Sequence, residues 1–201
     1  MIRHWLPAAA LSGLLVACAS PPQQVYVLGA ATPIAAGTLS EASKPHIEIM
    51  TVSVPDYLDT TDIMRRSGPN EVTPSLTGQW GERLSIGVTD ALAALLNHVQ
   101  STTIVSRQEP AMATRQLLVQ VLRFDIGTDG NCSLVARWQV LAAIHQATLA
   151  SERGSYSAKA TAPGDEAAAA AMTQALGSLA ENIAATLSKI PAPPDPRLHG
   201  G

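Results

Sequence analysis

The side chains that could perform catalysis or bind a metal are few and scattered in this sequence. Of the three histidines away from the chain ends, only His46 has a carboxylate close by, that of Glu48. No segment has the Gly-x-Ser-x-Gly pattern of a serine nucleophile, the His-Glu-x-x-His pattern of a zinc site or a phosphate-binding glycine loop. The sequence therefore predicts a protein that is not an enzyme and that holds neither a metal nor another cofactor.

The densest polar cluster has three carboxylates at every third position, Asp56, Asp59 and Asp62. Such spacing is compatible with a calcium-binding loop. That loop needs glycine at its sixth position and glutamate at its twelfth, however, and Thr61 and Ser67 stand there. The sequence favours a solvated connector in which aspartate side chains bond to the local backbone.

Two apolar residues, Tyr57 and Leu58, lie inside this polar connector, and Arg65 and Arg66 follow shortly after it. Apolar residues rimmed by charge suit a protein interface. They suit equally a local anchor that holds a loop on the core. Tyr57, Leu58 and Arg66 are therefore candidates for contact with a partner protein.

The most specific chemical signal is Cys18. Residues 1–17 contain Arg3 and then an apolar run of a length typical of a secretory signal peptide and too short to span a bilayer. The run ends in Leu15-Val16-Ala17-Cys18, which resembles the bacterial lipobox. In proteins with this pattern the cysteine thiol receives a diacylglycerol and the chain is cut before the cysteine. We predict a signal peptide at 1–17 and a lipidated Cys18 that anchors the protein in a membrane.

The residues after Cys18 predict where the anchor lies. Residues 18–24 form a short tether, and Ala19 stands where aspartate resembles an inner-membrane retention signal. This favours the outer membrane, with the protein facing the periplasm. The other cysteine, Cys132, then has no partner in an oxidising compartment, and a small buried residue is the expected role for its thiol.

Composition limits the remaining classes of function. The chain has 201 residues, a formal net charge of −3 and only 14 % charged residues. It has no basic excess to neutralise phosphates, which argues against binding to nucleic acid. Its hydrophobic content of 46 % is sufficient for a folded core, and its length fits one domain.

Hydrophobic periodicity predicts the elements that carry these residues. Between 25 and 190 we expect strands, a helix, several strands and a second helix, followed by a disordered Pro-rich tail at 191–201. The expected helices cover 80–98 and 165–188; the expected strands are 25–28, 46–54, 62–67, 70–73, 102–106, 116–124, 133–144 and 148–160. Two amphipathic helices need a sheet to cover. The predicted fold is a single α+β domain, a mixed β-sheet covered on one face by two amphipathic helices, whose other face meets solvent or a partner.

The order of short motifs resembles the PqiC-like family of ABC-type transport auxiliary lipoproteins. The motifs follow a lipobox and span nearly the whole chain after it. They are a Tyr-containing strand at Tyr26, Pro55-x-Tyr57-Leu58-Asp59, Trp80-x-Glu82-x-Leu84, Arg123-Phe124-Asp125, Ala136-Arg137-Trp138 and Ala171-Met172-x-x-Ala175-Leu176. Thr60-Thr61-Asp62 departs from the Arg-Pro-Gln-like segment that usually follows Leu-Asp in the family.

The resemblance implies an accessory role without catalysis. Such lipoproteins are the outer-membrane-side component of systems with an MCE-domain periplasmic protein and an ABC or inner-membrane partner, which carry lipids between the two membranes. The expected role is to dock the periplasmic component. An open sheet face and edge also favour a homo-oligomer. A structural or assembly lipoprotein of the outer membrane, unconnected to lipid transport, is the alternative that the sequence leaves open.

Overall fold

The computed structural model describes residues 23–29, 44–100, 102–107 and 113–191. The predicted signal peptide (1–17), the lipidated Cys18, the first part of its tether and the Pro-rich tail beyond residue 191 lie outside these described residues. None of the helices in the described ranges combines the length and apolarity that a membrane crossing requires.

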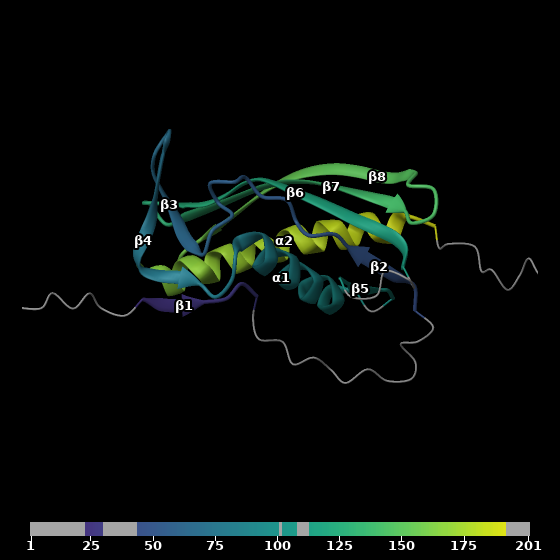
Figure 1. The fold of residues 1–201 in the computed structure, drawn as a ribbon, viewed down its shortest axis with the longest axis horizontal. Coiled ribbons are helices and arrows are strands. Elements are labelled where there is room, and N and C mark those ends of the chain that lie inside the picture. Colours follow the sequence, from purple (N-terminus) through teal and green to yellow (C-terminus); the bar gives the residue numbers. More distant parts are fainter. Residues whose placement is uncertain (1–22, 30–43, 101, 108–112, 192–201) are drawn as a thin grey trace, which may run out of the picture.

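The described residues form one mixed eight-stranded sheet and two helices (Figure 1). The elements are β1 (Gln24–Tyr26), β2 (His46–Ile49), β3 (Asp62–Gly68), β4 (Glu71–Trp80), α1 (Leu84–Val99), β5 (Ile104–Ser106), β6 (Ala113–Gly127), β7 (Asn131–Ala142), β8 (Thr148–Lys159) and α2 (Asp165–Lys189). The predicted α+β fold with a single mixed sheet is confirmed.

The 15-residue strand β6 is the centre of the sheet. One edge of β6 pairs with β7, and its other edge is shared by β2 near its start and β3 near its end, both parallel to it. β1 and β4 continue the sheet beyond β3, β5 follows β2, and β8 pairs only with β7. The strands expected at 116–124 and 148–160 are present, the first in the centre of the sheet and the second at its edge.

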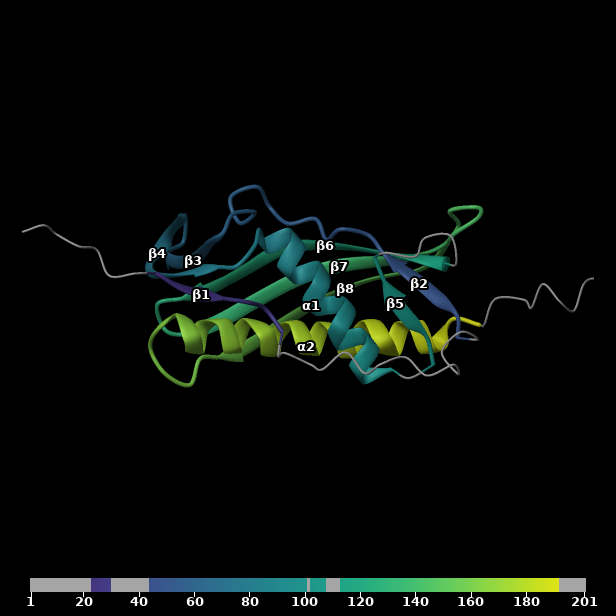
Figure 2. The ribbon, with the colours of Figure 1, turned by 60° about the horizontal axis from the view of Figure 1, so that its bottom comes forward.

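Both helices lie on the same face of the sheet (Figures 1 and 2). α2 runs along β7 and β8, and α1 packs against α2 and β5. The helix expected at 165–188 is confirmed, and α2 buries a stripe that comprises Met172, Ala175, Leu176, Leu179, Ile183 and Leu187. Across this interface the indole Nε1–H of Trp138, on β7, donates to Thr186 Oγ1 of α2 at 3.3 Å. Apolar burial along this stripe is the main term that holds α2 to the sheet.

The first helix starts later than its periodicity predicted. Trp80 ends β4 instead of opening α1: it pairs with Tyr26, its backbone N–H donates to Thr61 O at 2.6 Å, and its side chain is 4 % exposed. α1 begins at Leu84. Its buried stripe includes Leu96, which is fully buried, whereas Leu95 is only partly buried. β4 extends to Trp80, and the helix starts after it, because β1 supplies a pairing partner for the end of β4.

Two further strand predictions differ from the structure in length. The predicted hairpin at 62–67 and 70–73 is confirmed, but β4 continues to Trp80. The predicted strand at 46–54 ends at Ile49, and residues 50–53 then follow β6 through separate bonds, such as Met50 N to Leu117 O and Ser53 N to Val119 O. The irregular path of this segment leaves space above β6.

A polar clamp fixes the β3–β4 hairpin to the start of α2. Asp165 is 4 % exposed and accepts hydrogen bonds from Arg65 Nη2 at 2.8 Å, Ser75 Oγ at 2.7 Å and Thr77 Oγ1 at 2.6 Å. Gly78 allows this approach, because a Cβ there would lie 2.7 Å from Asp165 Oδ2. Burial by itself would raise the pKa of Asp165, but its hydrogen bonds and the Arg65 charge outweigh burial and lower it.

Candidate functional site

The face of the sheet opposite the helices carries no helix of the described chain (Figure 1). Side chains on this side alternate with the buried ones along β6 and β7, and the strand register aligns them in rows across β8. We call this surface the open face; its central residues are Leu118, Gln120, Val135, Arg137, Gln139, Ser151 and Arg153. Leu118, Gln139 and Ser151 form one row, and Gln120, Arg137 and Arg153 form the next.

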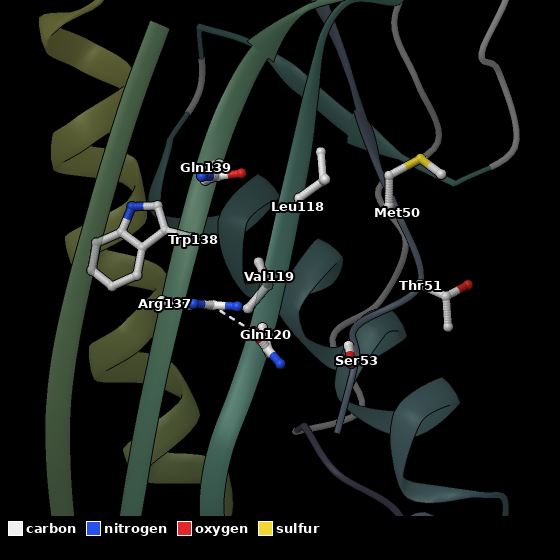
Figure 3. Close-up of a pocket in the computed structure, with 9 residues that line it drawn as sticks. All are labelled: Met50, Thr51, Ser53, Leu118, Val119, Gln120, Arg137, Trp138 and Gln139. Carbon is white, nitrogen blue, oxygen red and sulfur yellow. Dashed lines mark hydrogen bonds between the residues drawn. The ribbon is translucent and has the colours of Figure 1, made fainter. Parts of the chain in front are cut away.

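A groove of about 500 Å³ crosses the open face between residues 50–53 and strands β6 and β7 (Figure 3). Met50, which is 41 % exposed, and Leu118 give the groove an apolar side. Gln120 and Arg137 give it a polar side, where Arg137 Nε donates to Gln120 Oε1 at 2.5 Å. The indole of Trp138 points away from this groove toward α2 (Figure 3). Apolar and hydrogen-bonding groups side by side on an open surface suit a protein segment.

The open face is basic although the chain as a whole is acidic. Four arginines lie on it: Arg66, Arg123, Arg137 and Arg153. The described carboxylates on it are already engaged. Asp125 is fully buried beneath Arg66 and Arg123, and Glu48 accepts from Gln116 Nε2 at 2.7 Å. The chain carries a net charge of −3, so the excess of arginine on this face differs from the balance of the chain as a whole.

Asp125 organises the end of the open face nearest the β3–β4 hairpin. Arg66 Nη2 lies 2.6 Å from Asp125 Oδ2, and Arg123 Nε lies 3.0 Å from Oδ1. The hydrogen bond with Asp125 raises the pKa of Arg66, burial opposes the rise, and the nearby Tyr57 phenol adds to it. The side chains of Arg66 and Arg123 remain 22 % and 45 % exposed, so both retain donors toward solvent.

The structure places the three sequence-predicted interface residues in different environments. Tyr57 and Arg66 come together on the open face, and Tyr57 is 43 % exposed. Leu58 is 1 % exposed and belongs to the core. Its backbone N–H closes a turn onto Pro55 O at 2.8 Å. Leu58 is thus the local anchor of the connector, and its side chain is not available to a partner in this conformation.

Asp59, in the aspartate cluster beside Tyr57, binds residues at the start of α1. Asp59 Oδ1 accepts from the backbone N–H of Ser85 at 3.1 Å, and Asp59 Oδ2 pairs with Arg83 at 2.7 Å. The local turn is closed by threonine and not by the expected aspartate: the Thr60 hydroxyl accepts from the Asp62 N–H at 2.7 Å. Among the described residues, no three His, Cys, Asp or Glu side chains are grouped closely enough to hold a metal ion.

Cys132 lies in the core and has no exposed surface. Burial raises the pKa of its thiol to about 12, with the charge of Asp125 adding to the rise. We expect a maleimide at pH 8 to react with native Cys132 more than about a hundredfold slower than with the urea-unfolded protein, because only the thiolate attacks. Mass spectrometry of timed samples measures both rates, and similar rates would contradict an inert, buried thiol.

Sequence reasoning missed the arginines and glutamines that line the groove. In the expected strand 133–144, the apolar residues Leu134, Ala136, Trp138 and Val140 alternate with other residues, among them Arg137 and Gln139. What the sequence lacked was the register, which brings Arg153 of β8 and Gln120 of β6 beside Arg137. Pairing across three strands is set by long-range contacts that no local pattern encodes.

The family model of the ABC-type transport auxiliary lipoprotein component matches residues 26–184. The chain belongs to this family. The resemblance in the short motifs is therefore confirmed, and membership indicates a membrane-anchored lipoprotein that assists a transporter. The sequence has no significant match among the curated proteins compared with it.

Solved structures share the fold of this lipoprotein. A crystal structure described as an uncharacterized protein is 16 % identical, with a TM-score of 0.70, over 83 % of this chain and 99 % of the other. Protein XCC0632 from Xanthomonas campestris is 17 % identical, with a TM-score of 0.65, over 83 % and 98 % of the two chains. At these identities the likeness concerns the fold alone.

Proposed function

We propose that this lipoprotein is anchored in the outer membrane by lipid on Cys18, faces the periplasm and docks an MCE-domain protein of a lipid transport system through the open face. The observation that supports this proposal is the asymmetry of the sheet. Both helices cover one side, while the other side presents a groove and four arginines (Figure 1). Membership of the auxiliary lipoprotein family supports a role as a transporter component.

The chemistry of the open face defines the partner surface that would fit it. Arg137 and Arg153 stand side by side in the strand register, and the two carboxylates described on the open face bind other residues, Asp125 to Arg66 and Arg123 and Glu48 to Gln116. An acidic segment with one or two apolar side chains complements this arrangement, since Met50 and Leu118 line the groove next to Arg137. The proposed role is non-catalytic: binding and positioning of a periplasmic conduit.

Charge reversal on the open face tests the proposal. We expect Arg137→Glu with Arg153→Glu to lower the recovery of an MCE-domain protein with the tagged lipoprotein at least about tenfold, because opposed charges replace attraction at the interface. The measurement is capture through a C-terminal tag from gently solubilised membranes of the native host, followed by quantitative mass spectrometry. Undiminished recovery with the double variant would contradict docking through this face.

The matched control is Glu152→Arg. Glu152 is the exposed neighbour of Arg153 on β8, and it pairs with Trp138, which faces the helices. A charge change at Glu152 therefore falls on the other side of the same strand, and it should leave recovery unchanged. If the wild-type protein captures only outer-membrane barrels or cell-wall proteins, the structural or assembly role replaces the transport role.

A further inference from the structure

Three exposed apolar side chains, Val25 and Val27 at β1 and Leu76 on β4, define what we call the β1 patch. They are 59 %, 65 % and 83 % exposed. Single exposed aliphatic residues are ordinary, but these belong to two paired strands at the edge of the sheet. A Cβ on Gly81 would touch both valines at 3.4 Å, so the two valines flank the end of β4 together.

The strand geometry turns the β1 patch away from the protein interior. Ser75 and Thr77 both reach Asp165, so Leu76 between them points to the opposite side of β4. Tyr26 pairs with the buried Trp80 and packs against the core. Its neighbours Val25 and Val27 therefore point outward as well.

The length of the tether ties this edge to the anchor. Val25 is seven residues from Cys18, and an extended chain spans at most about 25 Å over that length. α2 alone has 25 residues and is about 38 Å long. It starts next to β4 at Asp165, and its far end lies toward the β7–β8 turn (Figures 1 and 2). A domain standing upright on its β7–β8 end would hold β1 about 38 Å from the bilayer, farther than the tether spans, whereas a domain resting on its β1 end stays within reach of Cys18.

The two valines of the β1 patch lie in an uncharged stretch of the sequence. From Cys18 to Ser40 there is no Asp, Glu, Lys or Arg, in a chain with 14 % charged residues. No charge in this segment would have to be removed from water when it approaches a lipid surface.

We propose that the β1 patch rests on the lipid bilayer, with Val25, Val27 and Leu76 at the level of the headgroups. This inference rests on the proposed anchor at Cys18 and adds an orientation to it. β1 is the edge strand of the sheet and lies below the helices in Figure 1, whereas β6, β7 and β8, which carry the open face, lie above them. Contact through β1 therefore directs the open face and its groove away from the membrane, toward a periplasmic partner.

Site-specific labelling of the full lipidated protein tests the orientation. Single cysteines at Val27→Cys, Leu76→Cys and Ile144→Cys, each in a Cys132→Ala background, carry an environment-sensitive fluorophore. Ile144 is the matched control, since it lies in the β7–β8 turn and is 87 % exposed, against 83 % for Leu76. The proteins are reconstituted into vesicles of phosphatidylethanolamine and phosphatidylglycerol, with or without brominated acyl chains.

We expect blue-shifted emission at positions 27 and 76 and quenching by brominated lipid at least about twofold stronger than at 144, because side chains at the interface enter the headgroup region. Water-like emission at all three positions would overturn the proposal. A blue shift without bromine quenching would also overturn it, since protein and not lipid would then cover the patch.

Flotation of the same vesicles separates this proposal from the one it rests on. If the wild-type protein does not float with the vesicles, anchoring fails and both proposals fall. If it floats but Leu76→Cys remains water-like, the anchor stands and only the orientation is wrong.

Discussion

Replacement of Cys18 by alanine is expected to move this protein almost entirely from the membrane fraction to the soluble periplasm. In the proposal the acyl chains on Cys18 make the attachment, and the variant lacks the thiol that would carry them. Each buried methylene contributes about 0.8 kcal/mol, and one chain alone binds reversibly whereas two or three hold firmly. Cell fractionation followed by immunoblotting measures the distribution, and mass spectrometry of the wild-type N-terminal peptide detects the lipid directly.

The control for this variant is already present in the sequence. Cys132 is the only other cysteine, and it is buried in the core. Cys132→Ala should leave the protein in the membrane fraction. A Cys18→Ala protein that stays with the membrane, or that is soluble but fully restores outer-membrane integrity to a deletion strain, would contradict a functional lipid anchor at this residue.

The second large effect is expected at Asp165. We expect Asp165→Ala to lower the free energy of unfolding by about 2–4 kcal/mol, since it leaves the Arg65 charge and the hydroxyls of Ser75 and Thr77 without their shared acceptor. Arg65 is 29 % exposed, so water takes up part of the loss. Urea unfolding of the purified protein, followed by circular dichroism, measures the change.

Glu166→Ala is the matched control for Asp165→Ala. Glu166 occupies the same first turn of α2 but is exposed. Both variants lose one negative charge near the helix start, so their difference isolates the clamp from the helix dipole. Glu166→Ala should change stability by no more than about 0.5 kcal/mol. Equal losses in the two variants would show that the clamp contributes nothing of its own.

The contribution of Asp165 should also depend on pH. Its pKa is lowered in the folded protein, so the folded state binds this proton more weakly than the unfolded state does. The stabilisation is therefore complete well above the unfolded pKa of about 3.9, and it is lost as pH falls through the folded pKa. The stability difference between wild type and Asp165→Ala should narrow below about pH 4, and a constant difference would argue against an ionised clamp.

Local sequence patterns predicted the helices and strands in which buried residues recur with a regular period. The stripe from Met172 to Leu187 and the alternation around Trp138 identified α2 and β7 because each period directly reports one buried face. The pairing of β1 with β4 joins residues such as Gln24 and Gly78, far apart in the chain. Partners at such separation leave no local signal. Trp80 was expected in a helix for the same reason, since its pairing with Tyr26 could not be predicted from the local sequence.

The candidate site also contains residues that the local sequence could identify and residues that it could not. Residue type and context singled out Tyr57 and Arg66, which the structure brings together on the open face. The depth of Leu58 could not be predicted, because an apolar residue in a polar connector is equally compatible with an anchor and an interface. The groove depends on the register of β6, β7 and β8, and Arg137 becomes conspicuous only once Gln120 and Arg153 lie beside it.

The positions of the tryptophans make the protein's own fluorescence informative. Of the three in the sequence, Trp5 lies in the predicted signal peptide, so the processed protein retains Trp80 and Trp138. Both indoles are buried, one where β1 meets β4 and the other bonded to α2. The emission of Trp138 therefore reports separation of the long helix from the sheet, and that of Trp80 reports loosening of the strand next to the tether. Trp138→Phe leaves only Trp80 to emit and Trp80→Phe leaves only Trp138, so the two variants follow the two regions separately without an added dye.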